Sequence, residues 1–289
     1  MEGWLIGNGF LKNRKFSELI QLFLAAADKA NISLSVYTNA ELLAETKGIG
    51  KDKPDFVLFW DKDIVLAHYL EIQGISLYNS SEAIRLCDDK RLTHLALMKE
   101  GLPVPRTLAA PMTYSNIGFT DYDFLDKVEC ELCYPFVMKE AFGSFGEQVY
   151  FIRDREELLK KICQTKSTEL LFQEYISESC GRDVRLQVVG DRVVASMYRY
   201  SDTDFRANVT AGGKMKKHTP SKEECDLALS AARAVGASFA GVDLLFGPEG
   251  PLVCEINSNA HFKNIQACTG VPVAEKMIEY ICEDWRRKQ

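Results

Sequence analysis

Two apolar stretches near the end of the chain, AGVDLLF at residues 240–246 and PLVCEINSNAHFKN at residues 251–264, carry acidic side chains inside segments typical of buried strands. Side chains two residues apart on a strand point to the same face, so Glu255 and Asn257 share one face. A buried carboxylate without a partner costs several kcal/mol, so this face requires a compensating cation. The candidates are an arginine, a lysine or a metal ion.

The turn-rich GPEGP between the two stretches favours an antiparallel hairpin. A loop of three or five residues pairs Asp243 with Glu255, and a loop of four residues pairs Asp243 with Cys254. Pro251 cannot donate to the ladder, which favours the longer loop. Asp243, Glu255 and Asn257 would then form a set of hard oxygen ligands suited to Mg²⁺, or an acid pair satisfied by nearby arginines. Local sequence leaves both alternatives open.

Composition limits the classes of partner. The chain has 289 residues, 46% hydrophobic and 26% charged, with a net charge of −6, which argues against nucleic acid or an anionic membrane surface as partner. No apolar run approaches the roughly 20 residues needed to span a bilayer. The N-terminus has no cationic leader, and the nine cysteines are scattered through apolar runs. We therefore expect reduced thiols and a cytoplasmic protein.

The order of elements changes near residue 100. Strand and helix patterns alternate before it, which predicts a parallel α/β layer, and residues 79–101 read as one long helix capped by Ser80 or Ser81. LPVPRTLAAP, residues 102–111, breaks this pattern, and strands then follow one another as in an antiparallel α+β fold. We expect three domains: an α/β domain at residues 1–86, a subdomain with a glycine-rich lid at 87–174, and a subdomain with the acidic strands at 175–289.

Three further segments carry polar residues suited to binding an anion or a nucleotide. FVMKEAFGSFGEQVYF, residues 136–151, places Lys139 in an apolar strand before a glycine loop, whose backbone N–H groups can bind phosphate. LFQEYISESCGRDVRLQVV, residues 171–189, ends an apolar run with polar groups. YRYSDTDFRANVTAGGKMKKH, residues 198–218, mixes arginines, an asparagine and glycines. Each segment alone is also compatible with a simple turn, a surface ion pair or a solvated basic loop.

Taken together, in this order and spacing, these segments resemble the ATP-grasp carboxylate–amine ligases, most closely the RimK-type branch, from about residue 80 to about residue 281. The resemblance implies an α/β domain with a parallel sheet, followed by an α+β ATP-grasp fold whose two subdomains enclose ATP. It also implies a reaction in which ATP activates a carboxylate as an acyl phosphate, which the amine of an amino acid then attacks. The expected cofactors are ATP and Mg²⁺ or Mn²⁺.

The resemblance assigns a role to each candidate residue. Lys90 and Lys139 would hold the nucleotide phosphates, Gln173, Glu174 and Tyr175 would line the adenine pocket, and Asp183 would take the ribose. Ser144 and Arg206 would also bind the nucleotide. The remaining roles are catalysis by Arg206, Asn208 and Lys139, metal binding by Asp243, Glu255 and Asn257, and substrate binding by Arg199, Lys263 and Asn264. By this reading, metal rather than a salt bridge compensates the acidic face. One departure is the glycine loop GSFGEQV, where many relatives carry a further glycine in place of Glu147 or Gln148.

The identity of the substrates stays open. The expected partners are an amino acid donor and a peptide, carrier-protein or small-molecule carboxylate acceptor, and relatives often form homo-oligomers. An alternative enzyme is a graspetide-type ligase that closes lactams or lactones on a peptide, although the chain lacks an evident leader-binding extension. A second alternative is an ATP-binding regulatory module without turnover, which the presence of Lys90, Lys139, Arg206 and the metal-ligand set argues against.

Overall fold

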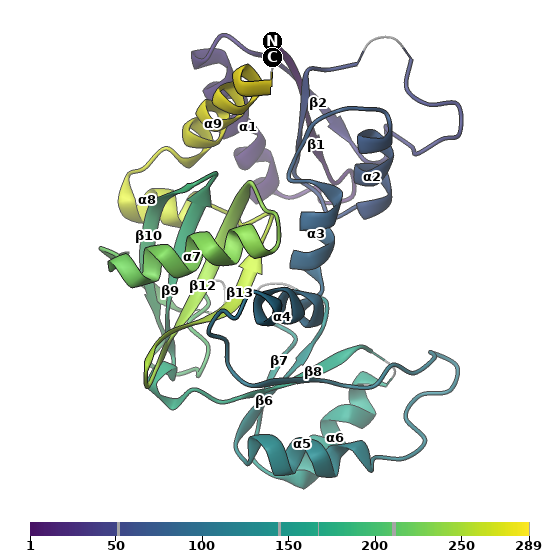
Figure 1. Ribbon diagram of the computed structural model, residues 1–289, viewed down its shortest axis with the longest axis vertical. Helices are drawn as coiled ribbons and strands as arrows, with labels where there is room; N and C mark the ends of the chain where they lie inside the picture. The colour runs from purple at the N-terminus through teal and green to yellow at the C-terminus, as the bar shows by residue number, and fades with distance from the viewer. Residues whose placement is uncertain (51–52, 144–145, 167, 210–211, 289) are drawn as a thin grey trace.

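A computed structural model describes residues 1–50, 53–143, 146–166, 168–209 and 212–288. The chain forms three sheets stacked along the long axis of the molecule, with both termini at the end occupied by the first sheet (Figure 1). Each sheet falls within one of the three expected segments. The expected α/β domain with a parallel sheet, followed by an α+β part with antiparallel sheets, is present. The domain boundaries themselves stay a prediction.

The first sheet is parallel, with strand order β2-β1-β3-β4, as the alternation of strand and helix patterns predicts. Its strands and the associated helices are β1 Glu2–Gly7, α1 Arg14–Lys29, β2 Ser33–Thr38, β3 Phe56–Phe59, α2 Ile64–Ile72, β4 Leu77–Tyr78, α3 Ser81–Asp88 and α4 Lys90–Lys99. The strand β3 is buried over its whole length because it lies in the interior of a two-face-covered sheet.

The prediction of a single helix over residues 79–101 is wrong, because the segment forms two helices that are divided at Asp89. Ser80 caps α3, and Asp89 then takes an extended conformation, with φ −92° and ψ 107°. The carboxylate of Asp89 accepts a hydrogen bond from the backbone N of Arg91 at 2.9 Å, so it caps α4 as an aspartate commonly does. The break makes Lys90 the first residue of a new helix.

The second sheet is antiparallel, with order β5-β8-β6-β7, and α5 and α6 cover one of its faces (Figure 1). Its elements are β5 Thr107–Ala109, α5 Phe124–Leu132, β6 Phe136–Glu140, β7 Val149–Ile152, α6 Arg155–Thr165 and β8 Leu170–Glu174. The sequence analysis assigned no element to β5 or α5. This sheet and its two helices enclose a separate hydrophobic core around Phe136 and Phe172.

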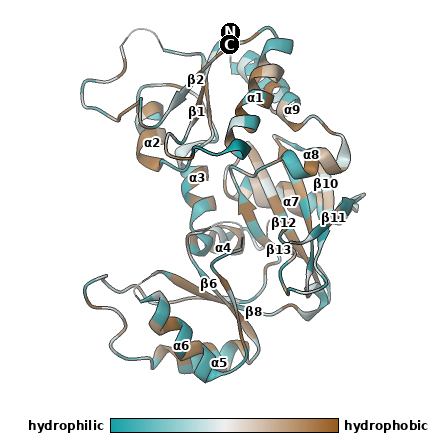
Figure 2. Cartoon of the chain, turned by 180° about the vertical axis from the view of Figure 1, so that it is seen from behind, coloured by the Kyte–Doolittle hydropathy of each residue, from teal (hydrophilic) through white to brown (hydrophobic). Residues whose placement is uncertain are grey.

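The third sheet is antiparallel, with order β11-β10-β9-β12-β13. Its elements are the short 3-10 helix η1 Ser177–Ser179, β9 Arg182–Val189, β10 Arg192–Tyr200, β11 Lys214–Lys217, α7 Lys222–Ala234, β12 Phe239–Gly247, β13 Gly250–Asn257, α8 Lys263–Thr269 and α9 Val273–Lys288. The edge strand β11, which the sequence analysis did not find, is hydrophilic, whereas the inner strands are largely apolar (Figure 2). Lysines on an exposed edge discourage pairing with another chain.

The first and third sheets share one hydrophobic core. Helix α1 packs against α9, and Phe23 of α1 meets Phe262 edge to face with ring centroids 5.3 Å apart. Asn79 joins the two sheets further: its side chain donates to the backbone oxygens of Phe239 and Ser258, both at 2.9 Å, and accepts from the backbone N of Phe239. The N-terminal and C-terminal segments are therefore packed as a single body.

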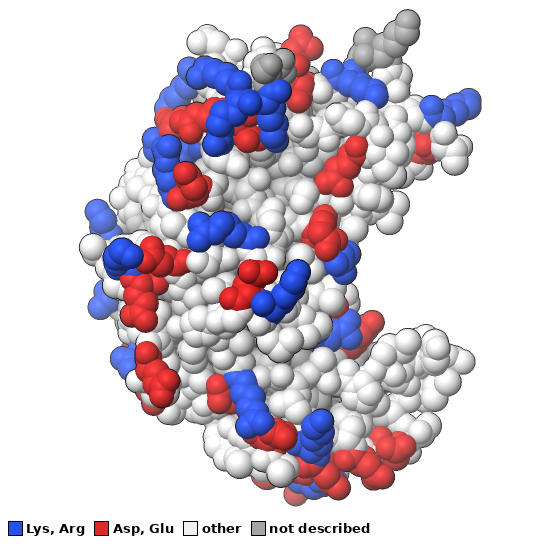
Figure 3. All heavy atoms as spheres, in the orientation of Figure 1, with Lys and Arg blue, Asp and Glu red and all other residues white. Residues whose placement is uncertain are grey.

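The surface charges are mixed in sign. On the face drawn in Figure 3, acidic and basic side chains are interspersed, and basic side chains gather at the end of the molecule that carries the chain termini. There the last turn of α9 holds Arg286, Arg287 and Lys288. Within the described ranges, no helix is both long and apolar enough to cross a bilayer.

Candidate active site

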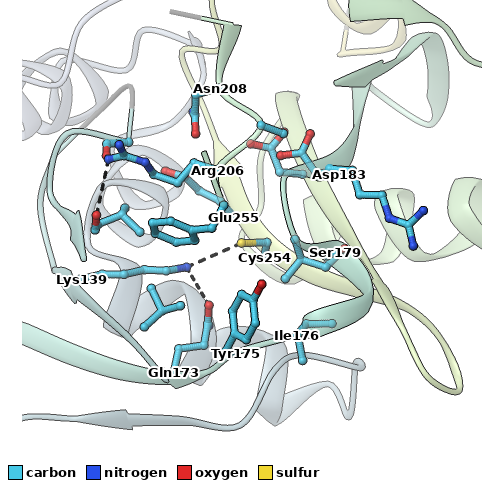
Figure 4. Close-up of a pocket in the computed structure, with 18 of the residues that line it drawn as sticks. Lys139, Gln173, Tyr175, Ile176, Ser179, Asp183, Arg206, Asn208, Cys254 and Glu255 are labelled. Carbon is cyan, nitrogen blue, oxygen red and sulfur yellow. Dashed lines mark hydrogen bonds between the residues drawn. The ribbon is translucent and has the colours of Figure 1, made fainter. Parts of the chain in front are cut away.

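A pocket lies between the second and third sheets, where segments that are far apart in sequence come together (Figure 4). Its floor and walls come from β6, β7 and β8 on one side and from β9, β10, β12 and β13 on the other. The polar residues that line it include Lys90, Lys139, Gln148, Gln173, Glu174, Tyr175, Asp183, Arg199, Arg206, Asn208, Asp243 and Glu255. Val137, Val149, Ile176 and Leu245 give it an apolar part, which is the composition expected of a site for a flat ring attached to charged groups.

Two lysines enter the pocket from different elements. Lys90 begins α4, and its Nζ donates to the backbone oxygen of Gly143 at 3.2 Å. Lys139 lies on β6, and its Nζ donates to Gln173 Oε1 at 2.7 Å and to Cys254 Sγ at 3.6 Å (Figure 4). Burial lowers the pKa of Lys90, the neighbouring Glu255 raises it, and Lys139 lowers it further. Two cations at one end of a pocket favour a ligand with several negative charges.

The segment that ends β8 forms the opposite wall. The carboxylate of Glu174 accepts from the backbone N of Arg106 at 2.8 Å, so it is engaged in joining β8 to the chain before β5. The ring of Tyr175 packs edge to face on Phe151, with centroids 4.8 Å apart. Burial, assisted by Cys180, raises the pKa of Tyr175 to about 12, so the phenol stays neutral. This wall presents an aromatic surface and backbone groups.

A network of four charges, three of them buried and Arg185 partly buried, crosses the third sheet. Arg199 Nε and Nη2 donate to the two carboxylate oxygens of Asp183 at 2.6 and 2.7 Å. Arg199 Nη2 also lies 2.9 Å from Asp243 Oδ2, and Arg185 donates to both oxygens of Asp243. Adjacent antiparallel strands bring these residues together, because Asp243 pairs with Arg185 and Arg199 pairs with Asp183 in the ladders. Arg199 is thereby held by two carboxylates while it also lines the pocket, and its role toward a substrate stays a prediction.

The hairpin of β12 and β13 pairs Asp243 with Glu255, as the sequence analysis considered, but by a different route. The expected longer loop is wrong: Gly247 pairs with Gly250, so only two residues connect the strands. A β-bulge at Cys254 then shifts the register and brings Glu255 opposite Asp243. Pro251 is tolerated because β13 is an edge strand.

The two acids of the hairpin differ in their partners. Asp243 is compensated by Arg185 and Arg199, so the expectation that metal rather than a salt bridge compensates it is wrong for this residue. Glu255 has no hydrogen-bond donor among the described residues, and its nearest cation is Lys90 Nζ at 4.0 Å. Asn257 ends β13 opposite Gly241 and is not among the described residues that line the pocket.

Arg206 connects the segment after β10 to the glycine loop. It donates to both carboxylate oxygens of Asp204, at 3.0 and 2.7 Å, and to the backbone oxygen of Gly146 at 2.5 Å. Gly146 has φ +76°, and a Cβ placed there would lie 2.9 Å from Asn208 Oδ1. A glycine is therefore required for this close approach. Ser144 of the same loop lies outside the described residues.

The expected substrate residues on α8 are not among those that line the pocket. Lys263 begins α8 and forms an ion pair with Glu18 of α1, in the region where the first and third sheets meet. Asn264 follows it on the same helix. Residues that the sequence analysis did not select include Arg185, Cys254 and His94. His94 could have been selected from its spacing, because it follows Lys90 by four residues and so lies on the same face of a helix.

Residues 87–281 match the family described as "RimK-like ATP-grasp domain". The chain belongs to the RimK-like ATP-grasp family. It is 36% identical over 220 residues to the "Probable alpha-L-glutamate ligase" of Legionella pneumophila strain Paris. The aligned region covers 75% of this chain and 70% of that protein. The prediction of an ATP-grasp ligase is confirmed by this membership.

Two solved structures show the same fold as this RimK-like chain. The RimK domain protein ATP-grasp of Sphaerobacter thermophilus aligns with a TM-score of 0.72 at 18% identity, over 97% of this chain and 99% of that one. The ATP-grasp ligase PsnB, complexed with a phosphomimetic variant of its minimal precursor, Mg and ADP, aligns with a TM-score of 0.70 at 18% identity, over 97% of each chain. At this identity the similarity establishes the fold alone.

Proposed function

We propose that this chain is an ATP-dependent ligase that activates a carboxylate as an acyl phosphate and joins it to the amino group of an amino acid. The observation that carries the proposal is the meeting of Lys90, Lys139 and Glu255 in one pocket, with Lys90 Nζ 4.0 Å from the Glu255 carboxylate. Two ammonium groups next to an acid that accepts no hydrogen bond from the described residues suit a polyphosphate bound together with a divalent cation.

The residues present fit a magnesium or manganese ion. Asp243, Glu255 and Asn257 offer the carboxylate and amide oxygens that these cations prefer, and Glu255 makes no hydrogen bond to the described residues. Asp243 keeps one lone pair on Oδ1, because its arginines make one bond to Oδ1 and two to Oδ2, and each carboxylate oxygen can accept two bonds. When bound, ATP supplies the phosphoryl group and the cation neutralises charge on its oxygens.

The chain's own residues then bind and orient the reactants. Lys90 and Lys139 neutralise phosphate oxygens, the wall formed by Tyr175 and its apolar neighbours holds the base, and Asp183 accepts from the ribose hydroxyls. Arg206 faces the reacting carboxylate together with Asn208. It stabilises the oxyanion that forms when the amine attacks, an effect worth about 2.7–4 kcal/mol per donor in other enzymes. Closure of the pocket over the acyl phosphate excludes water.

Glutamate is the first amino acid to test, because a relative is named as a probable α-L-glutamate ligase. Lys263 and Asn264 are the residues we propose to meet a substrate carboxylate. The acceptor belongs to one of three classes: a peptide, a carrier protein or a small carboxylate. The nine cysteines are free, which suits a reducing compartment such as the cytoplasm.

The test is phosphate release from MgATP with each of twenty amino acids and a pool of carboxylate acceptors, followed by mass spectrometry of the acceptors. A signal with one amino acid, and a matching gain in acceptor mass, supports the proposal. Loss of water from a peptide, without addition of an amino acid, would instead indicate a macrocyclising ligase. ATP binding without turnover for any acceptor, including peptides and carrier proteins, would indicate a regulatory module.

Lys139→Ala serves as the matched negative control in this assay, and Lys160→Ala serves as the positive one. Lys160 lies on the outer helix α6, is exposed, and is not among the residues that line the pocket. The proposal requires Lys139→Ala to lose phosphate release and Lys160→Ala to keep it. Equal activity of the two variants would contradict it.

A further inference from the structure

The side-chain amide of Gln173 in the pocket has both its nitrogen and its oxygen engaged in hydrogen bonds. Gln173 on β8 is 2% exposed. Its Oε1 lies 2.7 Å from Lys139 Nζ, while its Nε2 lies 2.9 Å from Thr107 Oγ1 and 3.0 Å from His94 Nε2. An ammonium group only donates, so the amide oxygen must face Lys139. The amide nitrogen must then donate one hydrogen to Thr107 and the other to His94.

The proton positions of the two neighbours follow from this arrangement. The Thr107 hydroxyl donates to the backbone oxygen of Pro105 at 2.8 Å, so it is free to accept from Gln173. His94 Nε2 must likewise present a lone pair, which places the ring proton on Nδ1. Burial, with the charges of Lys139 and Lys90 nearby, lowers the pKa of His94 to about 3. His94 is therefore neutral at physiological pH, as an acceptor must be.

The hydrogen bonds that run from His94 through Gln173 end at the Lys139 ammonium, which keeps one N–H donor for a ligand. The Lys139 ammonium has three N–H donors, and within the described part of the chain it gives one to Gln173 Oε1 and one to Cys254 Sγ (Figure 4). The third is left for a ligand in the pocket. With two donors fixed by protein acceptors, the direction of the third is also fixed.

We propose that His94 is a positioning residue for phosphate binding, which acts through Gln173 to hold the Lys139 ammonium toward the nucleotide. This inference rests on the proposed function, which gives Lys139 its phosphate. Lys90 stands one helical turn before His94 on α4, so a single helix both supplies one phosphate lysine and supports the other. Loss of the acceptor at His94 leaves one Gln173 hydrogen without a partner and releases the amide to rotate.

The test is calorimetric titration of the full chain with ADP and, separately, with adenosine, which lacks the phosphates. His94→Leu is expected to weaken ADP binding about tenfold and to leave adenosine binding unchanged, the size expected for loss of one well-placed hydrogen bond to a charge. His94→Gln, whose amide oxygen can occupy the place of Nε2, is expected to restore ADP binding. Leu97→Ala, which opens a cavity under the same helix, is expected to affect neither ligand.

Lys139→Ala separates failure of this inference from failure of the proposed function. If Lys139→Ala weakens ADP relative to adenosine while His94→Leu does not, the inference on His94 is wrong and the proposed function stands. If His94→Leu weakens both ligands equally, His94 is structural and the inference is also wrong. If Lys139→Ala leaves both ligands unaffected, the phosphate role of Lys139 is wrong and the inference falls with it. Should His94→Leu not fold, Gln173→Leu removes the same link and is expected to give the same selective loss.

Discussion

Arg185 holds Asp243 through two parallel hydrogen bonds, each 2.6 Å long, between neighbouring strands of the third sheet. Burial alone raises the pKa of Asp243, but the guanidinium groups of Arg185 and Arg199 outweigh it, so the pKa is lowered. The carboxylate is therefore ionised in the folded protein and already neutralised by side chains. A divalent cation at this position would share Asp243 with the arginines.

Replacing Arg185 with methionine is expected to destabilise the protein by about 3 kcal/mol, because it leaves a buried carboxylate with half of its partners. The measurement is the free energy of unfolding in urea. Arg192→Met is the matched control, since Arg192 pairs with Asp191 on the surface, where the side chains are 69% and 81% exposed. A loss below about 1 kcal/mol in Arg185→Met would mean that Arg199 alone suffices.

The stability of the protein is expected to depend on His94 below pH 6.5. The pKa of His94 is about 3 in the folded state against an ordinary value of 6.5, so the unfolded chain binds the proton first as pH falls. The contribution of the neutral His94 ring to the free energy of unfolding is complete above pH 6.5. It is lost on acidification, with a slope of up to about 1.4 kcal/mol per pH unit. Urea unfolding of wild type and His94→Gln between pH 7 and 5 measures it.

Between pH 7 and 5 the His94→Gln variant should lose less stability than the wild type, because glutamine does not titrate. Leu97→Ala, destabilised for a reason unrelated to protons, should keep the wild-type slope. Parallel curves for wild type and His94→Gln would show that His94 is not buried as a neutral ring.

Glu255→Gln is expected to abolish turnover while the melting temperature stays close to that of wild type, because Glu255 makes no hydrogen bond that supports the described fold. Asn257→Ala is expected to do the same if it binds metal. Turnover is measured as phosphate release, and the melting temperature by calorimetry. Glu249→Gln, at the exposed turn of the same hairpin, is the control. Normal activity in either test variant would refute the metal assignment for that residue.

Lys263→Ala is expected to raise the KM for the carboxylate or the amino acid far more than the KM for ATP. Lys263 forms an ion pair with Glu18 and does not line the pocket. Glu18→Gln removes the same ion pair and leaves Lys263 in place. If Lys263 only links α8 to α1, both variants should change stability and leave the ratio of the two KM values unchanged. That outcome would remove Lys263 from the substrate site.

The sequence was sufficient to predict the features that depend on local pattern. Lys139, Glu174 and Tyr175 each stand near the end of an apolar segment, and the structure brings them to one pocket with Lys90, which the family resemblance selected. Alternating patterns predicted the parallel first sheet, and successive strands predicted the antiparallel ones. These features follow from side-chain periodicity within single segments.

The features that the sequence did not predict depend on register between segments. The bulge at Cys254 places Glu255 opposite Asp243 despite a two-residue turn, and no local pattern indicates it. The pairing of Asp183 with Arg199, and of Asp243 with Arg185, follows from the alignment of three strands. His94 gains its role only when α4 meets β8, and helix α4 itself begins at a break that an aspartate cap produces.

The shared core of the first and third sheets limits how this protein can be shortened. A fragment of residues 87–281, the span of the family match, would lose α1 and β1–β4 and so uncover Phe239, Phe262 and Ile278, which are at most 1% exposed in the whole chain. Such a truncation is expected to aggregate or to remain unfolded by circular dichroism, although it retains every residue of the pocket. The N-terminal segment thus supports the sheet that contains the hairpin of β12 and β13.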